Sequence, residues 1–281
     1  MTAPKRWKGA GMPVLMVMAL VAGTPAAELK PATVAAFERY VRATEARISS
    51  ELHDEQRFLY VDGLADGTRR ARLAELAKGS LVIERLSTQE NRNSIDVADG
   101  LVHHWLGVAF VPGGTTAAAV ALLRDYNRHA EVYRPAVERS RIIEQSGDTY
   151  RVFLRFFMKK VISVTVNSEH LARFSQPRAG RAHSQIVSTR VQEVQDAGTS
   201  SERELPVGND GGYLWRINSY WRFLERDGGV YVQCESVSLS RDIPFGLGWV
   251  VGPFVTSIPR ESLTFTLETT RRVLQEGRGR L

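Results

Sequence analysis

The stretch from Ala136 to Ser240 constrains the fold most, because nearly all of it has the two-residue periodicity of β-strands. Short turns interrupt it, and Ser146-Gly147-Asp148 and Asp227-Gly228-Gly229 are typical of hairpins, which join neighbouring antiparallel strands. Consecutive hairpins build an antiparallel sheet and exclude the alternating strand–helix order of parallel-sheet proteins. We expect strands over 137–144, 150–166, 182–194, 213–225 and 230–240.

Helical periodicity lies before and after this run of strands. We expect helices over 31–52, 69–77, 117–128 and 259–275, and two earlier strands over 80–86 and 101–111. Gly79 follows the second helix in the usual stop position, and Thr115 or Thr116 caps the third. Because the strands are segregated from the helices, the sequence predicts an α+β fold, with an antiparallel sheet and the helices on one side of it.

The N-terminus has the three parts of a secretory signal peptide. Lys5, Arg6 and Lys8 supply positive charge, Met12 to Ala22 is apolar, and Thr24-Pro25-Ala26 offers small residues for cleavage. The apolar run is shorter than the roughly 20 residues that a membrane-spanning helix needs. We therefore expect an exported protein, periplasmic or secreted. Retention by an uncleaved N-terminal anchor is the alternative.

Cysteine usage argues against a disulfide-stabilised fold, and the charge distribution argues against a nucleic-acid-binding protein. The only cysteine, Cys234, cannot form an internal disulfide, so the fold has to rest on its hydrophobic core, for which 281 residues suffice. The formal charge is +6, but the basic residues are not gathered into one stripe. We therefore expect no nucleic-acid partner, although a mildly basic surface is compatible with contact to anionic membranes. The oligomeric state cannot be derived from these patterns.

Two segments carry a family resemblance. In Thr115 to Arg155, a helix ends in Leu123-Arg124-Asp125-Tyr126, and a turn then leads into Pro135-Ala136-Val137-Glu138-Arg139-Ser140, of the form Pro-x-Val-x-x-Ser. The last strand pair and the long helix, Gly212 to Gln275, form the second segment. The sequence thus resembles the START/SRPBCC superfamily over roughly 79–276, which implies a helix-grip fold, a curved antiparallel sheet wrapped around a long C-terminal helix. The implied division is a signal peptide (1–26), an N-terminal helical extension (27–78), the START-like domain (79–276) and a short tail (277–281).

The last hairpin predicts a cavity. A turn centred on Asp227-Gly228 pairs Trp221 with Cys234, and a turn shifted by one residue moves the partners without changing faces. One face sets large aromatic residues opposite cysteine and serine, which is typical of a ligand pocket. The alternative is that the long helix fills this space. The opposite face is polar and charged and is expected to be solvated. The expected lining of the cavity is Trp215, Ile217, Ser219, Trp221, Cys234, Ser236, Ser238, Leu263 and Leu267.

The segment from Ile243 to Pro259 has no charged residue and is interrupted by glycine and proline. We expect a loop just before the C-terminal helix. One interpretation is an apolar loop tucked into the core. The other is a movable gate to the cavity in which Phe245, Trp249 and Phe254 touch the ligand or a membrane surface, since exposed apolar patches mark interaction sites.

No motif for catalysis or for a cofactor stands out. His103 and His104 are adjacent on a strand and so point to opposite faces, one to the core or cavity and the other to the surface. No zinc spacing, nucleotide-binding loop or nucleophile elbow is present. We therefore expect no metal and no cofactor, and a non-catalytic function in binding or carrying an apolar small molecule or lipid. The alternative is a cyclase- or hydrolase-type enzyme that uses His103 or His104 with a cavity hydroxyl.

Overall fold

The computed structural model describes residues 27–159, 163–242 and 248–277, with the backbone alone for 248–256. Within these ranges one antiparallel sheet has the strand order β2-β5-β13-β12-β9-β8-β7-β6, and β10 pairs with β9. The strands are β2 (Val82–Arg85), β5 (Gly100–Pro112), β6 (Val137–Ser146), β7 (Thr149–Lys159), β8 (Ser163–Arg178), β9 (Arg181–Gln195), β10 (Arg203–Glu204), β12 (Arg216–Arg226) and β13 (Gly229–Arg241).

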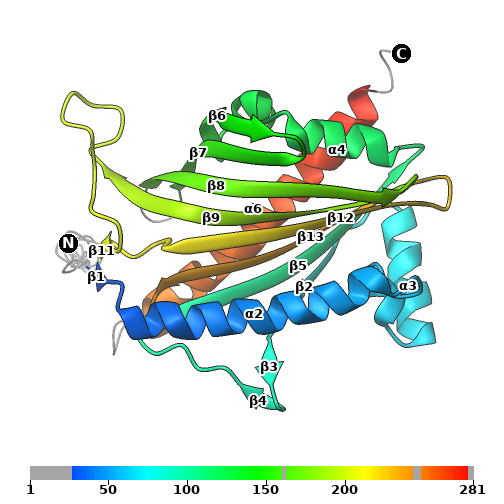
Figure 1. Ribbon diagram of the computed structural model, residues 1–281, viewed down its shortest axis with the longest axis horizontal. Helices are drawn as coiled ribbons and strands as arrows, with labels where there is room; N and C mark the ends of the chain where they lie inside the picture. The colour runs from blue at the N-terminus through cyan, green and yellow to red at the C-terminus, as the bar shows by residue number, and fades with distance from the viewer. Residues whose placement is uncertain (1–26, 160–162, 243–247, 278–281) are drawn as a thin grey trace, which may run out of the picture.

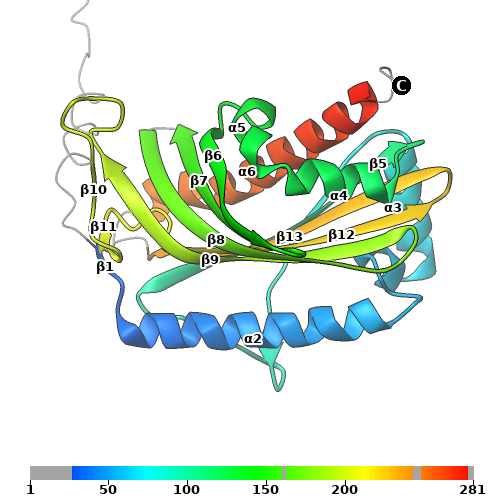
Figure 2. The same ribbon diagram turned by 45° about the horizontal axis from the view of Figure 1, so that its top comes forward.

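Helices lie on both faces of this curved sheet (Figures 1 and 2). The long helix α6 crosses the concave face together with α4 and α5, whereas α2 runs along the convex face. The helices are α2 (Pro31–His53), η1 (Tyr60–Gly63), α3 (Asp66–Ala77), α4 (Thr116–Arg124), η2 (Tyr126–Arg128), α5 (His129–Val132) and α6 (Gly248–Glu276). The α+β class and the helix-grip fold are confirmed, but the expectation that all helices lie on one side is wrong.

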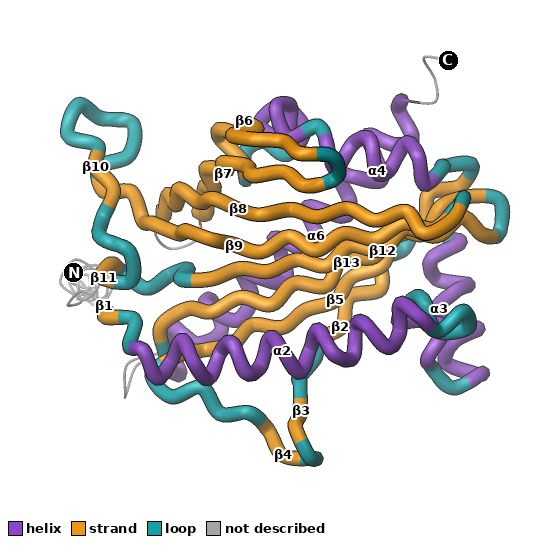
Figure 3. The backbone as a smooth tube through the Cα atoms, in the orientation of Figure 1, coloured by secondary structure: helices purple, strands orange, loops and turns teal. Residues whose placement is uncertain are grey.

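Short strand pairs complete the described chain. β1 (Ala27–Glu28) pairs with β11 (Asn209–Asp210), which ties the first described residues to the loop before β12. β3 (Gln89–Glu90) pairs with β4 (Asn93–Ser94), and Figure 3 shows this hairpin projecting away from the sheet beyond α2.

The C-terminal helix departs from the sequence-based expectation. α6 begins at Gly248 instead of Pro259, so most of the segment expected to be a loop is helical. Proline inside a helix removes one backbone hydrogen bond, yet α6 contains both Pro253 and Pro259. In the fold, α6 lies across β5, where Leu267 packs directly on Gly107, and a Cβ at Gly107 would clash with it. This close approach fixes where the helix crosses the sheet.

β8 also differs from the expectation. The segment 150–166 was expected to be a single strand, but β7 ends at Lys159 and β8 begins at Ser163 and continues to Arg178. His170 lies inside β8 and His183 inside β9, on either side of the turn that joins these strands. The concave face therefore has one more long strand than expected.

Candidate functional site

The last hairpin has the first of the two registers considered from the sequence. Trp221 pairs with Cys234, and Ile217 pairs with Ser238. Ser219 pairs with Ser236 between them. Directly opposed residues share a face of the sheet, so these side chains all lie on the concave side, toward α6.

The register carries this face across six strands. One row of neighbouring side chains runs from β5 to β7 through Trp105, Ser236, Ser219, Ile186, Ala172 and Tyr150. The next row contains His103, Ser238, Ile217, Ser188, His170 and Val152. We call the second one the histidine row. Both rows combine apolar side chains with hydroxyl groups, and the histidine row adds two imidazole rings. Between β5 and β7 neither row contains a charged side chain, but Arg85 of β2 pairs with Trp105 at the end of the first row.

Packing against α6 is complete on only one part of the concave face. Around Gly107, Trp221 and Cys234, the sheet meets Leu263 and Leu267 of α6, and all these side chains are buried in one cluster. Further along the same strands, Trp105, Ile217, Ser219 and Ser236 are only half-buried. The concave face thus has a filled part and an accessible part, and the accessible part mixes apolar and hydroxyl-bearing side chains.

Two buried histidines stand in the histidine row. His103 Nε2 lies 3.0 Å from Ser240 Oγ, and His170 Nε2 lies 2.8 Å from Ser168 Oγ. Burial lowers the pKa of His170 to about 4. Burial, with a smaller effect from the charge of Arg85, lowers the pKa of His103 to about 4 as well. At neutral pH both rings are therefore uncharged.

Trp215 is the exception among the predicted lining residues. Its side chain packs under α2 with Phe37 and Leu239, and its Nε1 donates to Asp210 Oδ1 at 3.0 Å. Trp215 precedes β12, where the chain bends out of regular strand geometry, so the alternation that places Ile217 does not extend back to it. The prediction that Trp215 shares the concave face is wrong.

The predicted gate residues are only partly covered by the structure. Phe245 lies outside the described residues. Trp249 and Phe254 belong to α6, whose side chains are not described there. Their contact with a ligand or a membrane surface stays a prediction. None of the described helices has the combination of length and hydropathy that a membrane-spanning segment requires.

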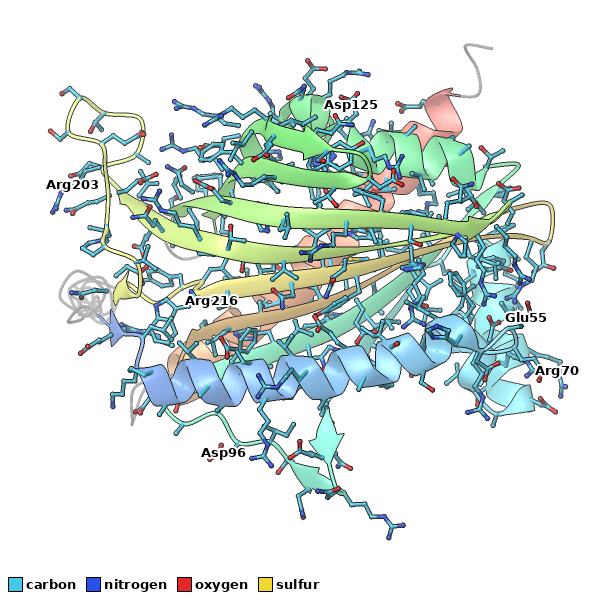
Figure 4. All side chains as sticks on the ribbon, viewed as in Figure 1. Glu55, Arg70, Asp96, Asp125, Arg203 and Arg216 are labelled. Carbon is cyan, nitrogen blue, oxygen red and sulfur yellow. The ribbon has the colours of Figure 1, made fainter. Side chains whose placement is uncertain are left out.

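The convex face, expected to be solvated, is buried under α2. Arg222 and Glu235 are both 0% exposed, and Glu235 Oε1 accepts from His104 Nε2 at 2.7 Å. His104 was one of the two adjacent histidines, and it does point away from His103, but into this interior and not to the surface. On this face, Figure 4 shows Arg216 near the N-terminal end of α2, where its side chain is half-buried.

Charges of alternating sign cross the interface between α2 and the sheet. Arg47 of α2 bonds both Glu235 and Glu51, and Glu51 Oε2 accepts from Arg222 NH2 at 2.6 Å. On the other side of the His104 ring, Tyr40 Oη of α2 lies 2.8 Å from Nδ1. A helical pattern with Arg and Glu between the apolar positions of α2 was visible in the sequence, but the partners across the sheet were not.

Neither histidine of the predicted pair presents an activated nucleophile. Ser240 Oγ donates its hydrogen to the carbonyl oxygen of Arg241 at 3.2 Å, so toward His103 Nε2 it accepts a hydrogen bond, and His103 is not placed to take the hydroxyl proton as a general base. His104 is enclosed beneath α2. In the part of the chain that is described, no three histidine, cysteine, aspartate or glutamate side chains gather where they could hold a metal ion.

No protein-family model and no curated protein matches this sequence. Several solved structures resemble it at low identity. The Zhui aromatase/cyclase from Streptomyces sp. R1128 is 12% identical, with 62% of this chain and 94% of that chain covered and a TM-score of 0.42. The STAR-related lipid transfer protein from Xanthomonas axonopodis is 19% identical, with 68% of this chain and 98% of that chain covered and a TM-score of 0.39. Human STARD10 is 9% identical, with 74% of this chain and 80% of that chain covered and a TM-score of 0.43. The helix-grip assignment rests on the strand order and on α6 of this chain.

Proposed function

We propose that this protein binds or carries an apolar small molecule or lipid between the concave face of its sheet and α6. The observation that carries the proposal is the half-buried state of Trp105 and Ile217 on the inner face, beside a fully packed cluster. Apolar side chains that keep accessible surface inside a fold are available for an apolar ligand, and a few hydroxyls among them are typical of such pockets.

The energetics favour an apolar ligand. Burying a methylene group contributes about 0.8 kcal/mol, so a chain of several carbons supplies useful affinity without a charged anchor. Between β5 and β7 the two rows offer no charged side chain to balance an ionised group, and Arg85 of β2, the cross-strand partner of Trp105, is exposed. Burial of an unpaired charge would cost far more than the methylene groups return.

We also propose that the protein acts outside the cytoplasm, which rests on the leader pattern of residues 1–26. The mature chain would begin at about Ala27. Intact-mass analysis of protein from an exporting host tests this proposal. A mass that includes Met1 to Ala26 would contradict cleavage.

The binding proposal is tested by filling the accessible part of the concave face. Ser236→Trp places a large side chain between Trp105 and Ser219, whereas Ser201→Trp in an exposed turn is the matched control. We expect the parent and Ser201→Trp to bind a solvatochromic apolar dye and to co-purify with lipids detectable by mass spectrometry. Ser236→Trp should lose both while keeping its far-ultraviolet circular dichroism. Equal binding by all three proteins would overturn the proposal.

A further inference from the structure

His170 has a defined tautomer. Ser168 Oγ donates its proton to the carbonyl oxygen of Leu154 at 3.0 Å, so toward His170 it can only accept. Nε2 of His170, 2.8 Å from Ser168 Oγ, therefore carries the ring proton. In a neutral imidazole the other nitrogen is then an acceptor. Nδ1 of His170 is thus a lone-pair acceptor.

This acceptor has no partner among the described residues. His170 is 3% exposed, and its Nδ1 is buried without a hydrogen bond. Buried polar atoms in native proteins are nearly always hydrogen-bonded, because leaving one unpaired costs free energy. The ring is aligned by Ser168 and by an edge contact with Phe156, whose centroid lies 6.1 Å away. The ring, which belongs to the histidine row, is therefore held in place with Nδ1 buried and unpaired.

A hydrogen-bond donor occupies the cross-strand position next to His170. Ser188 is the cross-strand partner of His170, so both side chains share the concave face. Ser188 Oγ accepts from the backbone N–H of Ile217 at 2.9 Å, which leaves its own proton free to be donated. Ser188 and His170 thus offer one donor and one acceptor at neighbouring positions.

A single hydroxyl group is the complement of this pair. It accepts through its oxygen and donates its proton, whereas an ionised carboxylate or phosphate ester only accepts. An ether oxygen also only accepts. The surrounding side chains in the histidine row, Ile217, Ser238 and Val152, carry no charge that would balance an anion.

We propose that His170 and Ser188 form a subsite for the hydroxyl group of an otherwise apolar ligand, such as a long-chain or polycyclic alcohol. The ligand hydroxyl donates to His170 Nδ1 and accepts from Ser188 Oγ, while its hydrocarbon part lies toward Ile217 and Trp105. This inference rests on the proposed function and narrows the ligand class to neutral amphiphiles.

The test compares three probes of equal chain length by displacement of an apolar dye at pH 8. Dodecan-1-ol can donate and accept, dodecyl methyl ether can only accept, and laurate is ionised. We expect the parent to bind dodecanol roughly tenfold more tightly than the ether, the size expected when a buried polar group loses its partner, and laurate more weakly still.

Variants separate this subsite from general apolar binding. His170→Leu removes the acceptor and should abolish the preference for dodecanol over the ether. His170→Asn keeps an acceptor oxygen near the position of Nδ1 and should retain most of the preference for dodecanol. Ser188→Ala should weaken the binding of dodecanol and of the ether alike. If the parent binds all three probes equally, or if His170→Leu keeps the preference, the subsite is wrong while the proposed function stands. If the parent binds none of the probes, the proposed function itself fails.

Discussion

His104 and Glu235 form a hydrogen bond of 2.7 Å between Nε2 and Oε1, with side chains that are only 2% and 1% exposed. This pair lies between α2 and the convex face of the sheet, and Arg47 of α2 bonds the same carboxylate oxygen. The helix is therefore held to the sheet by buried charges as well as by apolar packing. Removing one of these buried charges is costly, because its partner is then left without water and without the interaction that compensated for the lost hydration.

We predict that Glu235→Gln strongly destabilises the fold. The change leaves His104 and Arg47 without their shared carboxylate, and loss of one member of a buried ion pair costs on the order of 3–5 kcal/mol. The matched control is Glu38→Gln, which removes an exposed pair with Arg42 worth less than about 1 kcal/mol. Urea unfolding of both variants measures the two costs. Similar costs for Glu235→Gln and Glu38→Gln would contradict the role of the buried pair.

The same carboxylate gives this cost a pH dependence. Burial alone would raise the pKa of Glu235, but the hydrogen bond from His104 and the charge of Arg47 outweigh burial and hold the pKa below its usual value. A depressed pKa contributes stability that is present above the unfolded value of about 4.3 and is lost as the pH falls through the folded value. We expect the difference in unfolding free energy between the parent and Glu235→Gln to be constant from pH 6 to 8 and to shrink below pH 4.

The buried histidines make a separate prediction, in a higher pH range. The pKa of His170 is lowered to about 4 by burial, so between its unfolded value of about 6.5 and pH 4 the unfolded state binds one more proton than the folded state. Stability contributed by the neutral ring is thus complete above pH 6.5 and is lost as the pH falls, with a slope of about 1.4 kcal/mol per pH unit.

We predict that His170→Asn removes this slope. Unfolding free energies at pH 4.5, 5.5 and 6.5 should fall less steeply in the variant than in the parent. His53→Asn, at the exposed C-terminal end of α2, is the control and should follow the parent. Equal slopes for the parent and His170→Asn would mean that His170 titrates normally in the fold.

The contact between Gly107 and Leu267 predicts a steric limit. A Cβ at Gly107 would clash with Leu267 and lie 2.8 Å from Ile83 Cδ1, so Gly107→Ala should cost about 1–3 kcal/mol, as overpacking does. Gly63→Ala meets no atom within 4 Å and is the control. The double variant Gly107→Ala/Leu267→Ala should be destabilised by less than the sum of the two single variants, because the second change removes the clash. Strict additivity would show that the helix approaches β5 elsewhere.

Pattern reasoning succeeded where local chemistry decides the structure. The register that joins Trp221 to Cys234 follows from the turn at Asp227-Gly228 and from alternation, both of which are local. Alternation also identified Arg222 and Glu235 as sharing a face, but it could not tell what covers that face. The covering helix is distant in sequence, since 188 positions separate Arg47 from Glu235.

The His170–Ser188 subsite was missed for a related reason. The sequence around His170 mixes serine, asparagine, glutamate and histidine, which have weak strand preferences and favour a bend when considered alone. Long pairing with β7 and β9 overrides this preference. The signal that remained was the alternation of Val164, Val166 and Ser168 leading up to His170, which already has the period of a strand.

The tryptophans offer a direct readout of where a ligand binds. Trp105 is half-buried in a row on the concave face, whereas Trp215 is buried beneath α2 and hydrogen-bonded to Asp210. The sheet separates the two rings, so a ligand between the sheet and α6 reaches Trp105 and does not touch Trp215. Trp221 faces the same side as Trp105 but belongs to the packed cluster against α6.

We therefore predict that dodecan-1-ol changes the fluorescence of Trp105 and leaves that of Trp215 unaltered. Trp105→Phe should lose most of the spectral shift seen on titration of the parent, whereas Trp215→Phe should retain it. A brominated dodecanol strengthens the test, because bromine quenches only nearby rings: it should quench the parent and Trp215→Phe to a similar extent and Trp105→Phe much less. Quenching that disappears in Trp215→Phe but persists in Trp105→Phe would place the ligand on the convex side, under α2, and would overturn the proposed site.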